Sequence, residues 1–145
     1  MKPPPLAVKD YFFPATHLVA LSDHDPAGDN MGTQIETVIE HVQILESGDL
    51  YFQVQIKSDL EKSKNPPFDF SIIAFGLFSP TDTTAAKSKM GLQFAFSTLV
   101  GAAREHIATL SSKTPWAKFI LPPIVLSDDI FDAKAQELKA DQNAE

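Results

Sequence analysis

The chain has 145 residues, 43% of them hydrophobic, with no cysteine and a formal net charge of −7. This length and composition are typical of one domain with a buried core, and they exclude disulfides, thiolate catalysis and cysteine metal sites. The acidic charge makes nucleic acid an unfavourable partner, because phosphate contacts need clustered Lys and Arg. We expect a single domain over residues 1–145, with residues 1–5 and 141–145 disordered.

No apolar run approaches the roughly 18 residues of a membrane span. The N-terminus also has no hydrophobic signal core before Lys9 and Asp10. These two observations predict a soluble, cytoplasmic protein without a membrane span.

The first two predicted strands each contain an irregularity, at Pro14 in the first and near His41 in the second. Residues 6–13 are predicted to form a strand that ends at Pro14, and residues 16–21 extend it beyond a bulge or bend. After a polar loop, residues 33–45 form a second long strand. Its apolar positions change phase near His41, which indicates a bulge or a twist that swaps faces. The two sets are Ile35, Thr37 and Ile39 on one face, and Val42 and Ile44 on the other.

A tight hairpin is predicted at residues 46–49, where Gly48 can take a positive φ. Residues 50–60 then alternate between apolar and polar side chains, as in a half-buried antiparallel strand. After a polar connection, residues 68–78 form a fourth strand. This strand becomes apolar on both faces at residues 72–75, so we expect both of its faces to be covered there.

A long helix is predicted over residues 85–110, because apolar residues recur at three- and four-residue spacing. Ser79 followed by Pro80 has the composition of a helix start, and a short turn could precede the main helix. Gly91 and Gly101 are candidate breaks. The helix is apolar on more than one side and therefore needs cover from more than one side. Its apolar stripe consists of Leu92, Phe96, Leu99, Ala103, Ile107 and Leu110.

The segment 114–126 is predicted to be extended, because its prolines remove amide donors and keep the preceding residues out of the helical region. Its large apolar side chains must lie against another part of the protein. Ser127 to Asp129 then begin a final helix that runs to about Ala140. Four strands, a long helix, an extended Pro-rich segment and a short C-terminal helix together predict an α+β fold with a four-stranded antiparallel sheet.

The sequence contains no recognisable catalytic or metal-binding motif. The four histidines are scattered, and none has an i, i+4 partner with metal-ligand spacing. We therefore predict no enzyme activity, no metal and no cofactor. The histidines are His17, His24, His41 and His106.

Phenylalanine is the unusual feature of the composition, with eleven Phe against two Tyr and one Trp. Two interpretations stay open. The rings pack in the core, or they form an exposed apolar surface that binds segments of other proteins or other copies of this chain.

Three stretches resemble one known family. Residues 103–126 contain Ala-Arg-Glu, an aromatic residue after the helix, and the end Phe-x-Leu-x-Pro-Ile-x-Leu. This stretch is similar to the Ala-Arg-Glu and Leu-x-Leu-x-Pro-Val-x-Phe of the protein-export chaperone family SecB. Residues 76–79 (Gly-Leu-Phe-Ser) and 9–13 (Lys-Asp-Tyr-Phe-Phe) resemble that family's Gly-Ile-Phe-Ser and Lys-Asp-Ile-Ser-Phe. The resemblance spans residues 6 to about 132.

The resemblance implies an ATP-independent holdase that keeps preproteins unfolded for export and is assembled as a homotetramer, a dimer of dimers. It also implies hydrophobic client grooves along the extended segment, while the apolar helix implies an interface between copies. The expected client-binding residues are Trp116, Phe119, Leu121, Ile124 and Leu126. The expected interface residues are Phe12, Leu99, Ala103 and Ile107.

The resemblance further implies delivery of clients to the translocation motor SecA through carboxylates on the sheet. Asp10 matches one of these carboxylates, but Pro14 and Ser71 stand where two others are expected. We therefore expect SecA binding to be weak or absent. Two alternatives remain: a SecB-like chaperone dedicated to a narrow client such as an antitoxin, and an α+β domain that binds a small molecule in a Phe-lined cavity.

Overall fold

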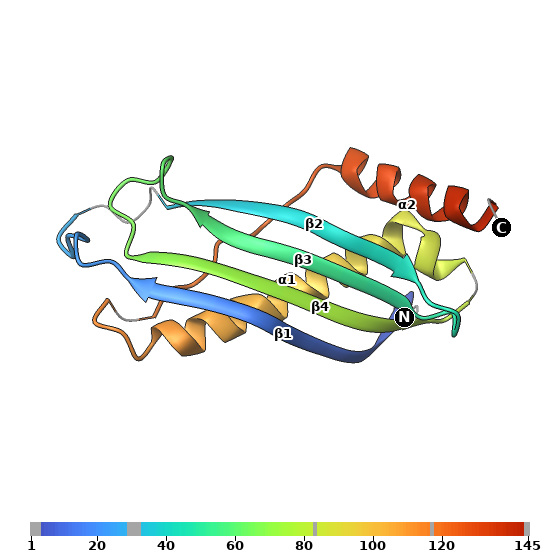
Figure 1. Cartoon of the computed structure of the whole chain (residues 1–145), viewed down its shortest axis with the longest axis horizontal. Coiled ribbons are helices and arrows are strands. Elements are labelled where there is room, and N and C mark those ends of the chain that lie inside the picture. The colour runs from blue at the N-terminus through green and yellow to red at the C-terminus, as the bar shows by residue number, and fades with distance from the viewer. Residues whose placement is uncertain (1–3, 29–32, 83, 117, 144–145) are drawn as a thin grey trace.

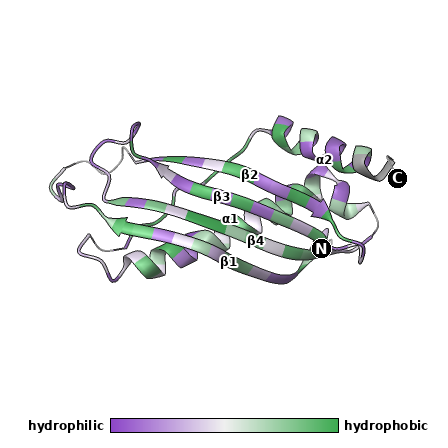
Figure 2. Cartoon of the chain, viewed as in Figure 1, coloured by the Kyte–Doolittle hydropathy of each residue, from purple (hydrophilic) through white to green (hydrophobic). Residues whose placement is uncertain are grey.

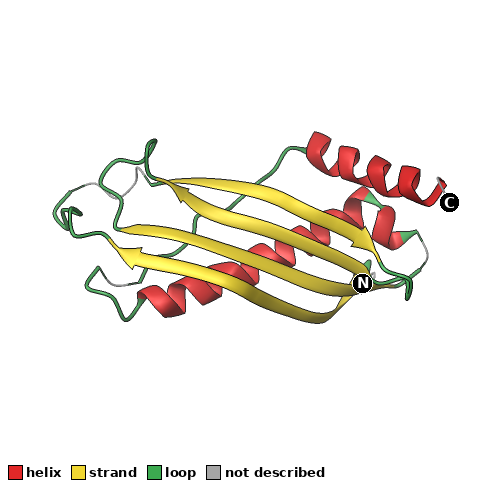
Figure 3. Ribbon diagram, viewed as in Figure 1, coloured by secondary structure: helices red, strands yellow, loops and turns green. Residues whose placement is uncertain are grey.

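The computed structural model describes residues 4–28, 33–82, 84–116 and 118–143. Four strands form one antiparallel sheet in the order β1-β4-β3-β2 (Figure 1). One helix, α1, crosses one face of this sheet, and a second, α2, lies beyond the edge formed by β2 (Figure 3). The α+β fold and four-stranded antiparallel sheet predicted from the sequence are confirmed. The elements are β1 (Leu6–Ala20), β2 (Gln34–Ile44), β3 (Leu50–Asp59), β4 (Phe68–Pro80), the 3-10 turn η1 (Ala85–Lys87), α1 (Lys89–Ser111) and α2 (Asp128–Asn143).

The two faces of the sheet differ in cover. The inner face, against which α1 packs, carries the fully buried alternate residues of β3 and β4, such as Phe52 and Phe70. Figure 2 shows the alternation of hydrophobic and hydrophilic residues along β3. On the outer face, none of the described elements lies over the sheet (Figure 1). The expectation that residues 72–75 are covered on both faces is wrong, because Ile73 and Phe75 point to this open face and are only half-buried.

A bulge in β2 explains its change of phase. The register of β2 with β3 shifts between Ile39 and His41, so the extra residue Glu40 has no partner of its own. Because the insertion restores the alternation, Val42 lies opposite the buried Phe52 and shares the inner face with Ile39. The predicted bulge is confirmed, whereas the predicted swap of faces is wrong.

Strand β1 continues through Pro14 instead of ending there. The register with β4 shifts between Phe12 and Ala15, which places Pro14 in a bulge. Since β1 is an edge strand, the missing amide of proline costs the sheet no necessary hydrogen bond. The extension over residues 16–21 is therefore part of the same strand, which reaches Ala20.

The long helix begins later than Ser79. Ser79 and Pro80 end β4, and the helix cap is Ser88, whose hydroxyl accepts a hydrogen bond from the Gly91 amide at 2.9 Å. Neither Gly91 nor Gly101 breaks the helix, which runs without interruption to Ser111. The hairpin prediction is confirmed, because Gly48 has a φ of +90°.

Hydrogen bonds and packing connect the described parts of the chain ends to the rest of the fold. The carbonyl of Pro5 accepts hydrogen bonds from the amide and hydroxyl of Thr81, at 3.0 and 3.1 Å. At the other end, α2 continues to Asn143 and packs on α1 through Phe131, whose ring centroid lies 5.6 Å from that of Phe96. Residues 1–3 and 144–145 of the predicted disordered ends lie outside the described residues.

A partly exposed ion pair ties β1 to the hairpin between β2 and β3. The Lys9 ammonium, at a bulge in β1, lies 2.8 Å from a carboxylate oxygen of Asp49. The hydrogen bond from Lys9, aided by one from the Ser47 hydroxyl, lowers the pKa of Asp49 below its ordinary value of 3.8. Lys9 therefore reaches across β4 to stabilise the start of β3.

Lys9→Met is expected to raise the pKa of Asp49 towards 3.8 and to destabilise the protein at neutral pH. A depressed carboxyl pKa contributes stability above the unfolded value, and this contribution is lost as the pH falls through the folded value. The stability difference between wild type and variant should therefore be present at neutral pH and vanish in strong acid. Urea unfolding at both pH values measures it, with the exposed Lys64→Met as the control. A difference that persists in strong acid contradicts the explanation.

Candidate functional site

Turns follow α1 at residues 112–116, and the extended segment, residues 118–127, then crosses the inner side of the molecule to α2 (Figure 1). The prediction that residues 114–116 are extended is therefore wrong. Polar contacts hold its first half. The single arginine, Arg104 on α1, donates from Nε to the Leu121 carbonyl at 3.0 Å and from Nη2 to the Pro122 carbonyl at 3.4 Å. The buried Ser111 hydroxyl accepts the Phe119 amide hydrogen at 2.7 Å. The sequence does not predict these roles of Arg104 and Ser111, because their partners are backbone groups, which every residue carries.

Trp116 fastens the segment to the far end of the sheet. Its indole N–H donates to the Leu21 carbonyl at 2.8 Å, and its ring lies edge-on to His24, with centroids 4.9 Å apart. His24 is itself buried and lies 3.0 Å, Nδ1 to oxygen, from the Asn65 carbonyl. The structure therefore places Trp116 as an anchor between two loops, with only part of its ring open to a client.

Phe119 and Leu121 cover the sheet. The Phe119 ring lies 5.8 Å from Phe68 and 5.6 Å from Phe70, centroid to centroid. Leu121 is 1% exposed. Leu121 therefore has no surface for a client, and its predicted client contact is corrected to a core position. Alternation in an extended segment sends these two side chains inward.

Other side chains of the segment point outward, and the phase of the alternation changes across Pro122 and Pro123. Ile120 is 62% exposed and Val125 is 88% exposed, whereas Ile124 and Leu126 are half-buried against the core. The sequence prediction missed Ile120 and Val125, although a period of two counted from Phe119 would have found Ile120.

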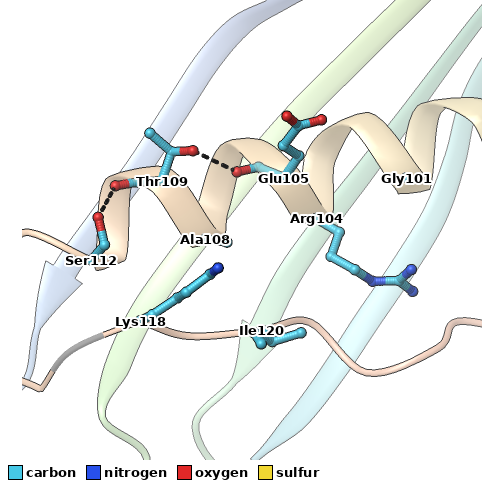
Figure 4. Close-up of a pocket in the computed structure, with 8 residues that line it drawn as sticks. All are labelled: Gly101, Arg104, Glu105, Ala108, Thr109, Ser112, Lys118 and Ile120. Atoms are coloured by element: carbon cyan, nitrogen blue, oxygen red, sulfur yellow. Dashed lines mark hydrogen bonds between the residues drawn. The ribbon is translucent and has the colours of Figure 1, made fainter.

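Two hollows flank the extended segment. The first, of about 490 Å³, lies between α1 and the segment, with Arg104, Glu105, Lys118 and Ile120 in its wall (Figure 4). The second, of about 270 Å³, lies between the start of β2 and residues 122–125. The segment is thus a ridge with exposed apolar side chains and a depression on each side.

The predicted interface residues of the helix lie in the core of the single chain. Leu99, Ala103 and Ile107 are each 0% exposed, because their stripe of α1 packs on the inner face of the sheet. They cannot touch a second copy while this packing holds, and their predicted role as interface residues is corrected accordingly. Phe12, by contrast, is 45% exposed on the edge strand.

The side of α1 that points away from the sheet is small and polar. Ser97, Gly101, Glu105 and Thr109 are exposed there, at four-residue spacing. A Cβ atom added to Gly101 would meet no atom within 4 Å. The helix is therefore less apolar on its second side than the sequence pattern suggested.

Asp10 lies on the outer face of the sheet, opposite Leu77 of β4. It is exposed, and its carboxylate accepts a hydrogen bond from the Tyr11 amide at 2.9 Å. Ser71, also on this face, lies 3.3 Å from the Gln55 amide nitrogen, and Pro14 occupies the β1 bulge. Within the described part of the chain no three His, Asp or Glu side chains are grouped to hold a metal, and no helix is long and apolar enough to cross a membrane.

These features define a class: the chain has the SecB-like α+β fold. No protein-family model matches the sequence, and a comparison with curated proteins finds no match. Among solved structures, the fold is similar to that of the SecB-like chaperone Rv1957 of Mycobacterium tuberculosis, in complex with a ChAD peptide from the antitoxin HigA1. The TM-score is 0.53 at 11% sequence identity, over 85% of this chain and 93% of that one.

Proposed function

We propose that this protein is an ATP-independent molecular chaperone that binds unfolded segments of other proteins in the cytoplasm. The observation that carries the proposal is the extended segment, which presents Ile120 and Val125 to solvent between two hollows. Exposed apolar side chains on a rigid, Pro-rich backbone offer a binding surface to extended apolar chains. Because the backbone is already fixed, binding costs less conformational entropy.

The site favours binding over small-molecule chemistry. A small-molecule site requires convergent polar groups in an enclosed cavity. The hollows beside the segment are open, and the arginine in the wall of the first already donates to the carbonyls of Leu121 and Pro122. The segment therefore supports repeated weak contacts along a polypeptide, where avidity over a long client supplies the affinity.

Two tasks fit this activity: general export and protection of a narrow client. The similar structure from Mycobacterium tuberculosis holds a peptide of an antitoxin, which supports the second task. The outer face also supports it, since Pro14 and Ser71 leave Asp10 without the neighbouring carboxylates expected for SecA. Assembly into a homotetramer is part of the proposal.

The double change Ile120→Ser and Val125→Ser is expected to weaken binding of an unfolded protein about tenfold, because it removes the two most exposed apolar groups of the ridge. The probe is a fluorescent, reduced and carboxymethylated protein, titrated by anisotropy. The matched control is Met90→Ser, which removes an apolar side chain that is 68% exposed at the start of α1. Unchanged binding in the double variant, with wild-type circular dichroism, refutes the ridge as the client site.

The export task is tested with the basic C-terminal tail peptide of SecA. We expect weak or absent binding, because Asp10 alone remains of the expected carboxylates. Any binding should fall with added salt, since exposed charge pairs are screened over about 10 Å at 0.1 M salt. Titration of wild type and Asp10→Asn at low and moderate salt measures this. Tight binding that survives both salt and Asp10→Asn contradicts the expectation.

A further inference from the structure

The outer face of the sheet carries an apolar patch that no described element covers (Figure 3). We call it the outer patch, and it comes from three adjacent strands. Phe12 of β1 lies opposite Phe75 of β4, and Leu77 of β4 lies opposite Tyr51 of β3. Its residues are Phe12, Tyr51, Ile73, Phe75 and Leu77.

The rings of the outer patch lie side by side across the strands. The centroid of Phe75 is 5.2 Å from that of Phe12 and 5.5 Å from that of Tyr51. His41 of β2 extends this row, with its ring centroid 5.5 Å from that of Tyr51. Phe12 is 45% exposed, and the other patch residues are half-buried, so the row presents ring surface to solvent over the full width of the sheet.

Carboxylates border the outer patch without a cation to balance them. Asp10 lies beside it on β1, and Glu40, in the β2 bulge, accepts a hydrogen bond from Gln53 at 2.6 Å. Among the ion pairs of the described residues, neither carboxylate takes part in one. Lys57, on the outer face of β3, lies towards the other end of the strand and pairs with Glu36 at 3.6 Å.

An aromatic row with unbalanced carboxylates at its border complements one kind of ligand. Lys and Arg side chains interact favourably with ring faces and with carboxylates, and apolar side chains pack on the rings between them. A row of rings along a sheet also accepts side chains of different shapes, because it imposes no closed outline. These properties suit an unfolded segment better than one folded partner of fixed shape.

We propose that the outer patch is a second client site, which takes unfolded segments with aromatic residues next to Lys or Arg. This inference rests on the proposed chaperone function and adds a specificity to it. The ridge takes apolar stretches on the inner side of the sheet, and the outer patch takes basic, aromatic stretches of the same client on the opposite side. Occupation of both sites by one long chain raises its affinity through effective concentration.

The test uses two fluorescent peptides of equal length, one alternating Phe and Lys and the other alternating Phe and Glu. Anisotropy is measured with the full chain at low and high salt. We expect the Phe/Lys peptide to bind more tightly, and Asp10→Asn with Glu40→Gln to remove most of this preference. The double variant Phe12→Ser and Phe75→Ser should weaken binding of the Phe/Lys peptide about tenfold or more.

The ridge variant Ile120→Ser with Val125→Ser separates the two proposals. If it weakens Phe/Lys binding while both outer-patch variants leave it unchanged, the outer patch is not a client site and the chaperone proposal stands. If wild type binds neither peptide nor an unfolded protein, both proposals fall. If Phe12→Ser with Phe75→Ser changes the mass measured by light scattering and leaves peptide binding unchanged, the patch is an interface between copies and the inference is overturned.

Discussion

Leu99→Asp is expected to unfold the chain. Leu99 is fully buried, and α1 comes so close to β4 at this point that a Cβ atom on Gly76 would lie 3.1 Å from Leu99 Cδ2. A carboxylate placed there has no partner and no water, which costs several kcal/mol, a large share of the roughly 5–15 kcal/mol that a domain of this size has. Far-ultraviolet circular dichroism and urea unfolding measure the loss.

Leu99→Met is the matched control, because it keeps the volume and apolarity of the side chain and should cost less than about 1.5 kcal/mol. Light scattering distinguishes a core position for Leu99 from the interface between copies that the sequence pattern predicted. A Leu99→Asp variant that keeps its circular dichroism but loses its subunits would show that Leu99 lies between copies after all.

Ser111→Ala is expected to destabilise the protein by about 1–3 kcal/mol, the usual cost of a buried polar group left unpaired. The Ser111 side chain is 0% exposed, and its hydroxyl is the acceptor for the Phe119 amide at 2.7 Å. Removal of the hydroxyl leaves that amide unpaired at the point where the extended segment turns back along α1. Urea unfolding measures the change, and hydrogen exchange at Phe119 should become faster.

The neighbouring Ser112→Ala is the control for this prediction. Ser112 is exposed, and its hydroxyl donates to the Thr109 carbonyl within the same helix end, at 2.7 Å. Its loss should change the free energy of unfolding by no more than about 0.5 kcal/mol. Equal effects of the two substitutions would contradict a special role for Ser111.

The sequence predicted the strands well where a local pattern reports directly on structure. Alternation over residues 50–59 and the glycine of the hairpin at Gly48 both depend on near neighbours in the chain. The prediction that the first strand ends at Pro14 was wrong, because a proline ends a central strand but not an edge strand. Whether a strand lies at the edge of its sheet depends on distant residues, which a local pattern does not report. The helix start predicted at Ser79 and Pro80 was wrong for a similar reason, since the same dipeptide is compatible with the end of β4.

The site was harder to predict, for a related reason. The apolar pattern that contains Leu99 and Ile107 predicts that one side of α1 is buried, but it does not identify the surface that buries it. In the structure, that surface is the sheet of the same chain. The pattern identified the extended segment but could not say which of its side chains point inward. The pattern predicts Leu121 as a client contact and omits Ile120, because the directions of these side chains follow from anchors such as Arg104.

The interrupted edge of β1 bears on how further chains could add to the sheet. A long, regular edge strand offers a row of free amides on which further chains can add and grow into fibrils. In β1, register shifts near Lys9 and Pro14 break that row into short stretches, and Pro14 brings no amide at all. The edge therefore offers no long, regular row on which aggregating chains could be templated.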